Sequence, residues 1–198
     1  MRIIAGKWGG RRIASPAGQL TRPTSDRMRE SLFSSLHSRI GSFEGLRVLD
    51  AFAGSGSLGF EALSRGADAL VALESNHKAS RVIRDNYENL AGDAGSDATF
   101  RLLQGDIFKL SAGLENLAID LAFFDPPYDM SDDKINALLL RLGELKVFAL
   151  GALIVVERAK SKEQQEFIPD NYVYLDTKTK GDTSLHFISF RGSMHGSS

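Results

Sequence analysis

The sequence predicts an α/β fold with a mostly parallel sheet, and two observations support this prediction. From residue 46 onward, short apolar segments typical of strands alternate with segments of helical periodicity. The chain has 198 residues, of which 42% are hydrophobic and 25% charged, so it is long enough to bury a core of its own. Strands that alternate with helices usually form a parallel sheet that helices cover on both faces.

The first 45 residues predict a small hairpin followed by one helix. Strand-like runs at Arg2–Ala5 and Arg11–Ala14 flank a glycine-rich turn. Thr24 or Ser25 is a suitable N-cap for a helix that ends near Ile40.

The remaining elements are predicted in regular alternation. Strands are expected at Leu46–Leu49, Ala69–Leu73, Thr99–Leu103, Ile119–Phe124, Ala152–Val156, Tyr172–Leu175 and Leu185–Phe190, the last two as a hairpin. Helices are expected at Ser57–Ser64, from an Asn76 cap to about Leu90, and at Asp132–Leu142, with a short helical turn at Asp106–Leu110. The predicted divisions are a basic hairpin arm (1–23), a main domain (24–190) and a polar tail (191–198) that is either frayed or a cloning remnant.

Composition excludes several classes of protein. The chain has no cysteine, which excludes a disulfide scaffold, a thiolate-held metal cluster and a cysteine nucleophile. Its four histidines form no cluster of ligands, so we expect no metal. No apolar run reaches the length of a membrane span and the N-terminus lacks a signal-peptide core, so we expect a soluble cytoplasmic protein.

Charge is distributed unevenly along the chain. Residues 1–30 carry seven basic and two acidic side chains, whereas the rest carries 17 basic and 23 acidic ones. A basic arm on an acidic body is typical of a protein that binds nucleic acid through one surface. The candidate RNA contacts are Arg2, Lys7, Arg11, Arg12, Arg22 and Arg27. Arg22 and Arg27 could instead pair with nearby acids, and Trp8 could stack on RNA, although we favour a role as anchor of the hairpin.

A glycine-rich loop follows the first predicted strand of the main domain. Gly54, Gly56 and Gly59 fit the pattern G-x-G-x-x-G, and Glu74 lies twenty residues beyond Gly54 at the end of the next strand. Glycines let the backbone turn tightly and approach a ligand, and the acid can accept hydrogen bonds from two ribose hydroxyls. These features alone are compatible with a dinucleotide-binding oxidoreductase.

Two acidic residues favour S-adenosylmethionine over a dinucleotide. Asp50 ends the first strand, where its charge would attract the cationic amino group of a methionine moiety and repel a phosphate. Asp106 follows the third strand and could accept a hydrogen bond from an adenine amino group, or could simply cap a helical turn.

The segment Asp125-Pro126-Pro127-Tyr128 follows the fourth predicted strand. Its two prolines stiffen the backbone and remove two amide donors, which leaves a carboxylate and carbonyl oxygens as acceptors. Acceptors in a fixed arrangement suit an exocyclic amine whose lone pair must face an electrophile. Tyr128 offers an aromatic face on which a flipped base can stack.

Together these motifs resemble the amino-group class of S-adenosylmethionine-dependent methyltransferases. Further segments are similar to the RsmD family: RIIAGKWGGRR from Arg2, TRPTSDRMRESLF from Thr21, DAFAGSGSLGFEALSRGA from Asp50 and KGDT from Lys180. The resemblance covers residues 2 to about 190.

The resemblance implies a class I, Rossmann-like methyltransferase fold whose seven-stranded sheet spans residues 47–190, with the last strand antiparallel. It implies that a monomer transfers a methyl group from S-adenosyl-L-methionine to the exocyclic N2 of one guanine in 16S ribosomal RNA, on a small-subunit assembly intermediate. The implied cofactor contacts are Asp50, Phe52, Gly54, Gly56, Glu74, Ser75, Asp106, Ile107 and Asp125. The implied catalytic residues are Asp125, Pro126, Pro127 and Tyr128.

The residues by themselves leave other functions open. A nicotinamide-dependent oxidoreductase would use the glycine loop but gives Asp125–Tyr128 no role. The intact motifs argue against an RNA-binding protein without catalytic activity. Adenine-N6 enzymes share the tetrapeptide, yet few residues remain outside the sheet for a DNA-recognition domain. Glutamine-N5 protein methyltransferases usually carry Asn where Asp125 stands.

Overall fold

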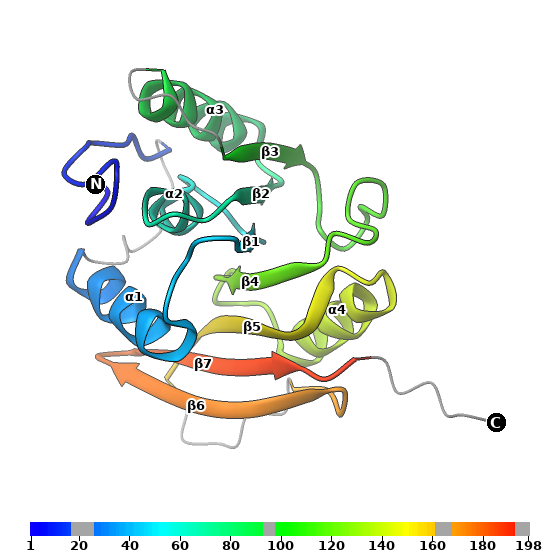
Figure 1. Cartoon of the computed structure of the whole chain (residues 1–198). Coiled ribbons are helices and arrows are strands. Elements are labelled where there is room, and N and C mark those ends of the chain that lie inside the picture. The colour runs from blue at the N-terminus through cyan, green and yellow to red at the C-terminus, as the bar shows by residue number, and fades with distance from the viewer. Residues whose placement is uncertain (17–25, 93–97, 161–167, 193–198) are drawn as a thin grey trace. The chain divides into compact units, whose positions relative to one another are not determined.

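The computed structural model describes residues 1–16, 26–92, 98–160 and 168–192 (Figure 1). The chain divides into two compact units, residues 1–107 and 108–198. The predicted boundaries between arm, main domain and tail stay a prediction.

The first unit begins with a hairpin that backbone hydrogen bonds hold together. Arg2 and Arg12 form an isolated antiparallel bridge, and the Ile3 amide donates to the Arg11 carbonyl at 2.9 Å. The Gly10 and Ile13 amides donate to the Ile3 and Met1 carbonyls across the same hairpin, so the hairpin expected at these residues is confirmed.

Helix α1 (Asp26–Ile40) follows the hairpin in the described residues and ends where the sequence predicts. Its apolar side chains recur at helical spacing, and Leu32 and Leu36 are buried. The expected capping residues Thr24 and Ser25 lie outside the described residues.

Parallel strands and their connecting helices make up the rest of the first unit. They are β1 (Arg47–Asp50), α2 (Ser57–Ser64), β2 (Ala69–Glu74), α3 (His77–Ala91) and β3 (Thr99–Gln104). β1 pairs in parallel with β2, and β2 with β3. Helix α2 packs on β1 and β2, and α3 packs on β2 and β3. Asn76 caps α3 as predicted, because its side chain accepts hydrogen bonds from the amides of Lys78 and Ala79.

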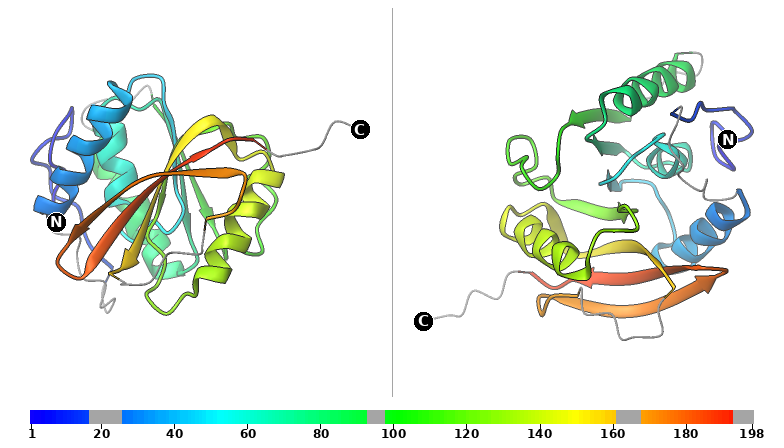
Figure 2. Two further views of the ribbon diagram at one scale, coloured as in Figure 1. Left: turned by 90° about the horizontal axis from the view of Figure 1, so that it is seen from below. Right: turned by 180° about the vertical axis from the view of Figure 1, so that it is seen from behind.

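The second unit contains one parallel strand pair and a reversed strand. Its elements are β4 (Ile119–Phe124), α4 (Asp132–Glu144), β5 (Phe148–Ala159), β6 (Tyr172–Lys180) and β7 (Thr183–Phe190). β4 and β5 are parallel, and β7 runs antiparallel between β5 and β6 (Figure 2). The seven strands have the order β3-β2-β1-β4-β5-β7-β6. This order, in a mostly parallel sheet whose last strand along the chain is antiparallel to both of its neighbours, confirms the predicted class I methyltransferase fold.

Two strands of the second unit are longer than predicted, and one of them, β6, spans Tyr172–Lys180 instead of Tyr172–Leu175. Strand β5 spans Phe148–Ala159 instead of Ala152–Val156, because backbone pairing continues past the buried residues that the apolar pattern marks. Leu150, for example, is 79% exposed although it belongs to the strand. A hydrogen-bonded turn at residues 107–109 follows β3, where a short helical turn is expected at Asp106–Leu110. The capping role considered for Asp106 stays a prediction.

Candidate active site

The glycine-rich loop leaves β1 and enters α2 through two residues with left-handed backbone. Gly54 has a φ of 57° and Gly56 a φ of 79°, which side chains with a Cβ rarely adopt. A Cβ on Gly56 would also lie 2.4 Å from the ring of Phe60. Glycine is therefore required at position 56 both for the turn and for the packing of the helix beneath it.

Asp50 connects the end of β1 to the first turn of α2. Its carboxylate is buried and accepts a hydrogen bond from the Gly59 amide at 3.0 Å. A Cβ on Gly59 would lie 2.7 Å from the methyl groups of Leu70, so the helix approaches the strand closely at this point. The hydrogen bond fixes the position of the carboxylate beside a helix start whose N-cap, Gly56, supplies no side-chain cap.

Glu74 holds the opposite side of the loop from the end of β2. One carboxylate oxygen accepts from the Gly54 amide at 2.9 Å and the other from the Asn76 amide at 2.7 Å. A carboxylate has about four acceptor positions, so both oxygens retain capacity for a ligand. The Glu74 carbonyl accepts from the Gly105 amide at 3.0 Å, which brings the end of β3 beside the end of β2.

The first unit thus brings Asp50, the loop glycines and Glu74 together, as the sequence predicts. The other expected cofactor residues flank this cluster along the chain. Phe52 and Asp106 are half-buried, Ser75 is exposed, and Ile107 is buried. Their contacts with a cofactor stay a prediction.

The second unit carries the Asp125–Tyr128 segment directly after β4. Pro126 is buried, Pro127 is exposed, and the Pro127 carbonyl accepts from the Met130 amide at 3.0 Å, which closes a turn. Tyr128 is 57% exposed and leaves its ring available for stacking. Burial raises the pKa of Asp125 from 3.8 to about 6. The expected acceptors therefore lie on a stiff turn, with a carboxyl that titrates close to neutral pH.

A second carboxyl group, which no motif of the sequence indicates as a site residue, lies beside this segment. Glu157 on β5 is half-buried, and burial together with the nearby charge of Asp125 raises its pKa to about 8. Phe124, the last residue of β4, pairs with Val156 of β5, so Asp125 and Glu157 each follow a member of this pair by one position. An acid that ends a buried apolar run was the only sequence signal for Glu157.

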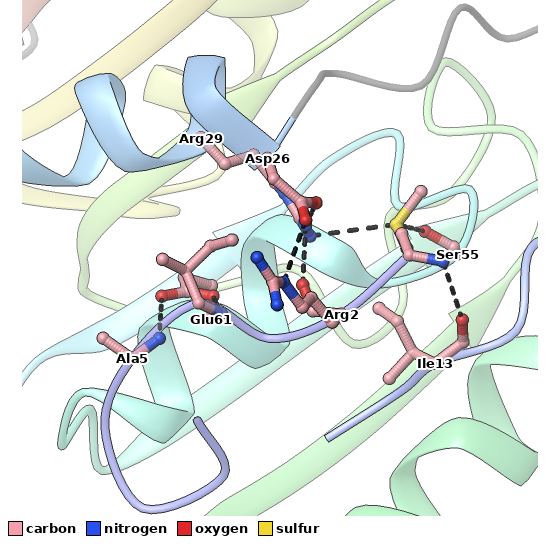
Figure 3. A network of polar contacts seen from close by, with 9 residues as sticks. Arg2, Ala5, Ile13, Asp26, Arg29, Ser55 and Glu61 are labelled. Carbon is pink, nitrogen blue, oxygen red and sulfur yellow. Dashed lines mark hydrogen bonds and ion pairs between the residues drawn. The ribbon is translucent and has the colours of Figure 1, made fainter. Parts of the chain in front are cut away.

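The basic arm is attached to the first unit through buried polar groups. Arg29 is fully buried and donates to the Arg2 carbonyl at 2.6 Å and to Asp26 at 2.7 Å (Figure 3). Arg2 pairs with the same carboxylate at 3.1 Å. Although burial acts in the opposite direction, these two guanidinium groups hold the pKa of Asp26 below its usual value. The basic residues that pair with Asp26 are thus Arg29 and Arg2.

Further polar side chains anchor the arm, among them Glu61, Ser64 and Asn86, and no local sequence pattern indicates this role. The carboxylate of Glu61, which is buried, accepts from the amides of Ile4 at 2.6 Å and Ala5 at 3.1 Å. Asn86 bonds both backbone groups of Ala14 and donates to the Ser55 carbonyl at 3.0 Å. The arm is therefore connected to the glycine-rich loop through Asn86.

The predicted RNA-contact residues differ in their availability. Arg12 and Arg27 are exposed. Arg11 instead donates to the carbonyls of Asn89 and Leu90 at the end of α3, at 2.8 and 3.0 Å. The Lys7 ammonium lies 4.8 Å from the ring centroid of Trp8. Arg22 lies outside the described residues.

Trp8 is fully buried, which confirms its expected role as an anchor of the hairpin. Its ring packs edge-on against Tyr87 of α3, with the ring centroids 6.4 Å apart. A buried indole is not available to stack on RNA.

Within the described ranges, no three His, Asp or Glu side chains gather as metal ligands. None of the helices in those ranges is both long and apolar enough to cross a bilayer.

Comparison with known proteins assigns the chain to a family. The family model described as Conserved hypothetical protein 95 matches residues 1–189. Ribosomal RNA small subunit methyltransferase D of Haemophilus influenzae is 36% identical over 185 residues, which are 93% of this chain and 91% of that protein. The chain belongs to the RsmD family.

Two other proteins match this chain over almost their whole length. YlbH of Bacillus subtilis is 32% identical and covers 97% of this chain and 100% of its own. The solved structure of yhhF from Escherichia coli has a TM-score of 0.79 at 29% identity, and the match covers 98% of this chain and 99% of that one. S-adenosyl-L-methionine is accordingly the expected cofactor of this RsmD-family chain.

The residues of the first unit fit that cofactor. The loop at Gly54 and Gly56 has the backbone conformation that a close ligand approach requires, and the buried carboxylate of Asp50 lies at the start of the helix that follows the loop. An acidic strand end at this position suits a cationic amino acid moiety better than a phosphate.

Proposed function

We propose that the chain transfers a methyl group from S-adenosyl-L-methionine to the exocyclic N2 of guanine 966, in standard numbering, of 16S ribosomal RNA. The observation that carries the proposal is the half-buried carboxyl of Asp125 on a proline-stiffened turn, in a chain of the RsmD family. Relatives of this chain bear the name Ribosomal RNA small subunit methyltransferase D, which supports ribosomal RNA as the substrate.

In this proposal the first unit holds the cofactor. Asp50 attracts the amino group of the methionine moiety, Glu74 accepts hydrogen bonds from the ribose hydroxyls, and Asp106 accepts one from the adenine amino group. Phe52, Ser75 and Ile107 complete the contacts. The bound cofactor supplies an electrophilic methyl group on a sulfonium.

The second unit prepares the amine. The Asp125 carboxylate and the Pro126 carbonyl accept the two N–H groups of the guanine amine, which turns the nitrogen lone pair toward the methyl group. The exposed ring of Tyr128 stacks on the flipped base. After transfer, the amine loses a proton to Asp125 or to water, so a histidine is not required.

In this proposal the exposed basic side chains near the N-terminus bind the RNA. Arg12 and Arg27 are the best placed, because they are exposed. Arg2 also contributes, since 62% of its side chain is exposed although it pairs with Asp26. We assign the substrate to a small-subunit assembly intermediate and the active form to a cytoplasmic monomer.

Two measurements test the proposal. Methylated nucleotides are mapped in small-subunit RNA from cells with and without the protein, and transfer of labelled methyl groups is compared between wild type and Asp125→Ala. We expect one guanine to lose its N2-methyl group without the protein, and the variant to lose turnover while it still binds S-adenosylhomocysteine. Unchanged turnover in the variant would refute the role of Asp125.

A thermal-shift comparison of two ligands distinguishes the proposed methyltransferase from the main alternative, a nicotinamide-dependent oxidoreductase. Stabilisation by S-adenosylhomocysteine and not by NADH is expected, because the Asp50 charge opposes a diphosphate. Stabilisation by NADH alone would favour an oxidoreductase.

A further inference from the structure

The Asp125 segment has a neighbour on the next strand that the proposed reaction does not yet use. The parallel register of β4 and β5 pairs Phe123 with Val155 and Phe124 with Val156. The next residues along the two strands are Asp125 and Glu157. Asp125 directly follows the last residue of β4, and its charge acts on Glu157, so the two carboxyl groups lie near each other beyond the buried part of the strands.

The other charged groups near Glu157 do not neutralise it. Because successive side chains on a strand point to opposite faces, Arg158 lies on the face opposite Glu157. There it donates hydrogen bonds to Asp132 and to the Met130 carbonyl, both at 2.7 Å. That face also carries His186, on which the charges of Asp132 and Arg158 act in opposite directions. On its own face, Glu157 is paired with the apolar Leu185 of β7, and the exposed Lys178 of β6 comes next in register.

Neither carboxyl group has a hydrogen-bond or ion-pair partner in the part of the chain that the structure describes. Half-buried carboxyls without donors are unfavourable in a folded protein, because desolvation and mutual repulsion are not offset. A pair of this kind is suited to a ligand that presents two adjacent N–H donors. It also shares a single proton near neutral pH, since the pKa of Glu157 is raised to about 8 and that of Asp125 to about 6.

We infer that Glu157 is a specificity-determining residue that accepts the N1–H group of the target guanine, while Asp125 accepts its N2 amine. The Watson–Crick edge of guanine presents these two donors side by side, whereas adenine presents an amine next to an unprotonated ring nitrogen. Binding of guanine displaces the proton of Glu157 to solvent. The inference rests on the proposed guanine-N2 transfer and adds how the base is selected.

The test compares two RNA substrates that differ at the target base. One carries guanine, and the other carries 2-aminopurine, which keeps the N2 amine but has an acceptor at N1 and no oxygen at C6. We measure kcat/KM for methyl transfer between pH 6.5 and 8.5 with wild type, Glu157→Gln and the exposed control Glu144→Gln. Wild type alone already gives a decisive profile, so the test survives a variant that fails to fold.

For wild type we expect opposite pH dependences. On guanine RNA, kcat/KM rises toward pH 8 because Glu157 must lose its proton to accept N1–H. On 2-aminopurine RNA it falls over the same range, because only protonated Glu157 can donate to N1. At pH 8.5 the preference for guanine reaches about tenfold to a hundredfold, the size of one lost hydrogen bond to a charged group.

Glu157→Gln should remove both pH dependences near 8 and reduce the preference for guanine about tenfold, since an amide can either accept or donate. Glu144→Gln should behave as wild type. The missing oxygen of 2-aminopurine affects all three proteins alike and cancels in this comparison. Parallel pH profiles for the two RNAs, or the wild-type preference in Glu157→Gln, would overturn the inference. If wild type methylates N2 of neither RNA, the proposed function itself fails.

Discussion

Replacement of Asp125 by Asn should stabilise the fold while it removes activity. Burial raises the pKa of this carboxyl from 3.8 to about 6, so the folded state binds its proton more tightly than the unfolded state. Ionisation of Asp125 therefore costs stability as pH rises through this range, and the full cost is present above pH 6. A pKa difference of about two corresponds to about 3 kcal/mol, which partial exposure of the group reduces to about 1–2 kcal/mol.

Urea unfolding of wild type and Asp125→Asn at pH 7 and pH 4 measures this gain. The variant should gain about 1–2 kcal/mol at pH 7 and much less at pH 4, where most of the carboxyl is protonated in the folded state. Asp170→Asn, at an exposed position of the same unit, is the matched control and should change little at either pH. A variant that is less stable than wild type at pH 7 would show that the carboxylate has stabilising partners, and the reasoning would fail.

Two further predictions concern the arm. Gly6 and Gly10 share a φ of 82°. A Cβ on Gly6 would lie 1.8 Å from the carbonyl oxygen of Ser64, whereas a Cβ on Gly10 would meet nothing within 4 Å. In urea unfolding, Gly10→Ala should cost about 1 kcal/mol and Gly6→Ala about 3 kcal/mol or more, and equal costs would contradict the close approach. Arg11→Ala should lower Tm by a few degrees because it loses two carbonyl partners, whereas Arg12→Ala should keep Tm and reduce the salt dependence of RNA binding by about one charge. Salt titrations with identical slopes for wild type and Arg12→Ala would remove this residue from the RNA surface.

The pattern of the sequence is sufficient to predict the elements that carry the site, because the relevant signals are local. The glycines after β1, the acids Asp50 and Glu74 at strand ends, and the Asn76 cap all act within a few residues of their position. Hydrophobic periodicity and turn chemistry report such features directly. Element ends are less accurate, since β5 pairs beyond its apolar core.

Availability of the basic residues could not be read from the sequence. Arg11 and Arg12 are adjacent arginines, yet Arg11 donates hydrogen bonds to carbonyls at the end of α3, whereas Arg12 is exposed. Arg29 is a basic residue of the same N-terminal region as the predicted RNA contacts, but it is fully buried and links the hairpin to α1. Each outcome depends on backbone carbonyls that distant segments supply, and these leave no local pattern.

The sequence by itself determined the strand–helix alternation, the glycine turn with its acids, and the proline-stiffened acceptor segment at Asp125. Only the tertiary structure decided that Glu157 lies beside Asp125, more than thirty residues away along the chain. The reason is that register between parallel strands is set by packing across the whole sheet, whereas the residues between the two strands carry no signal for which side chains will become neighbours.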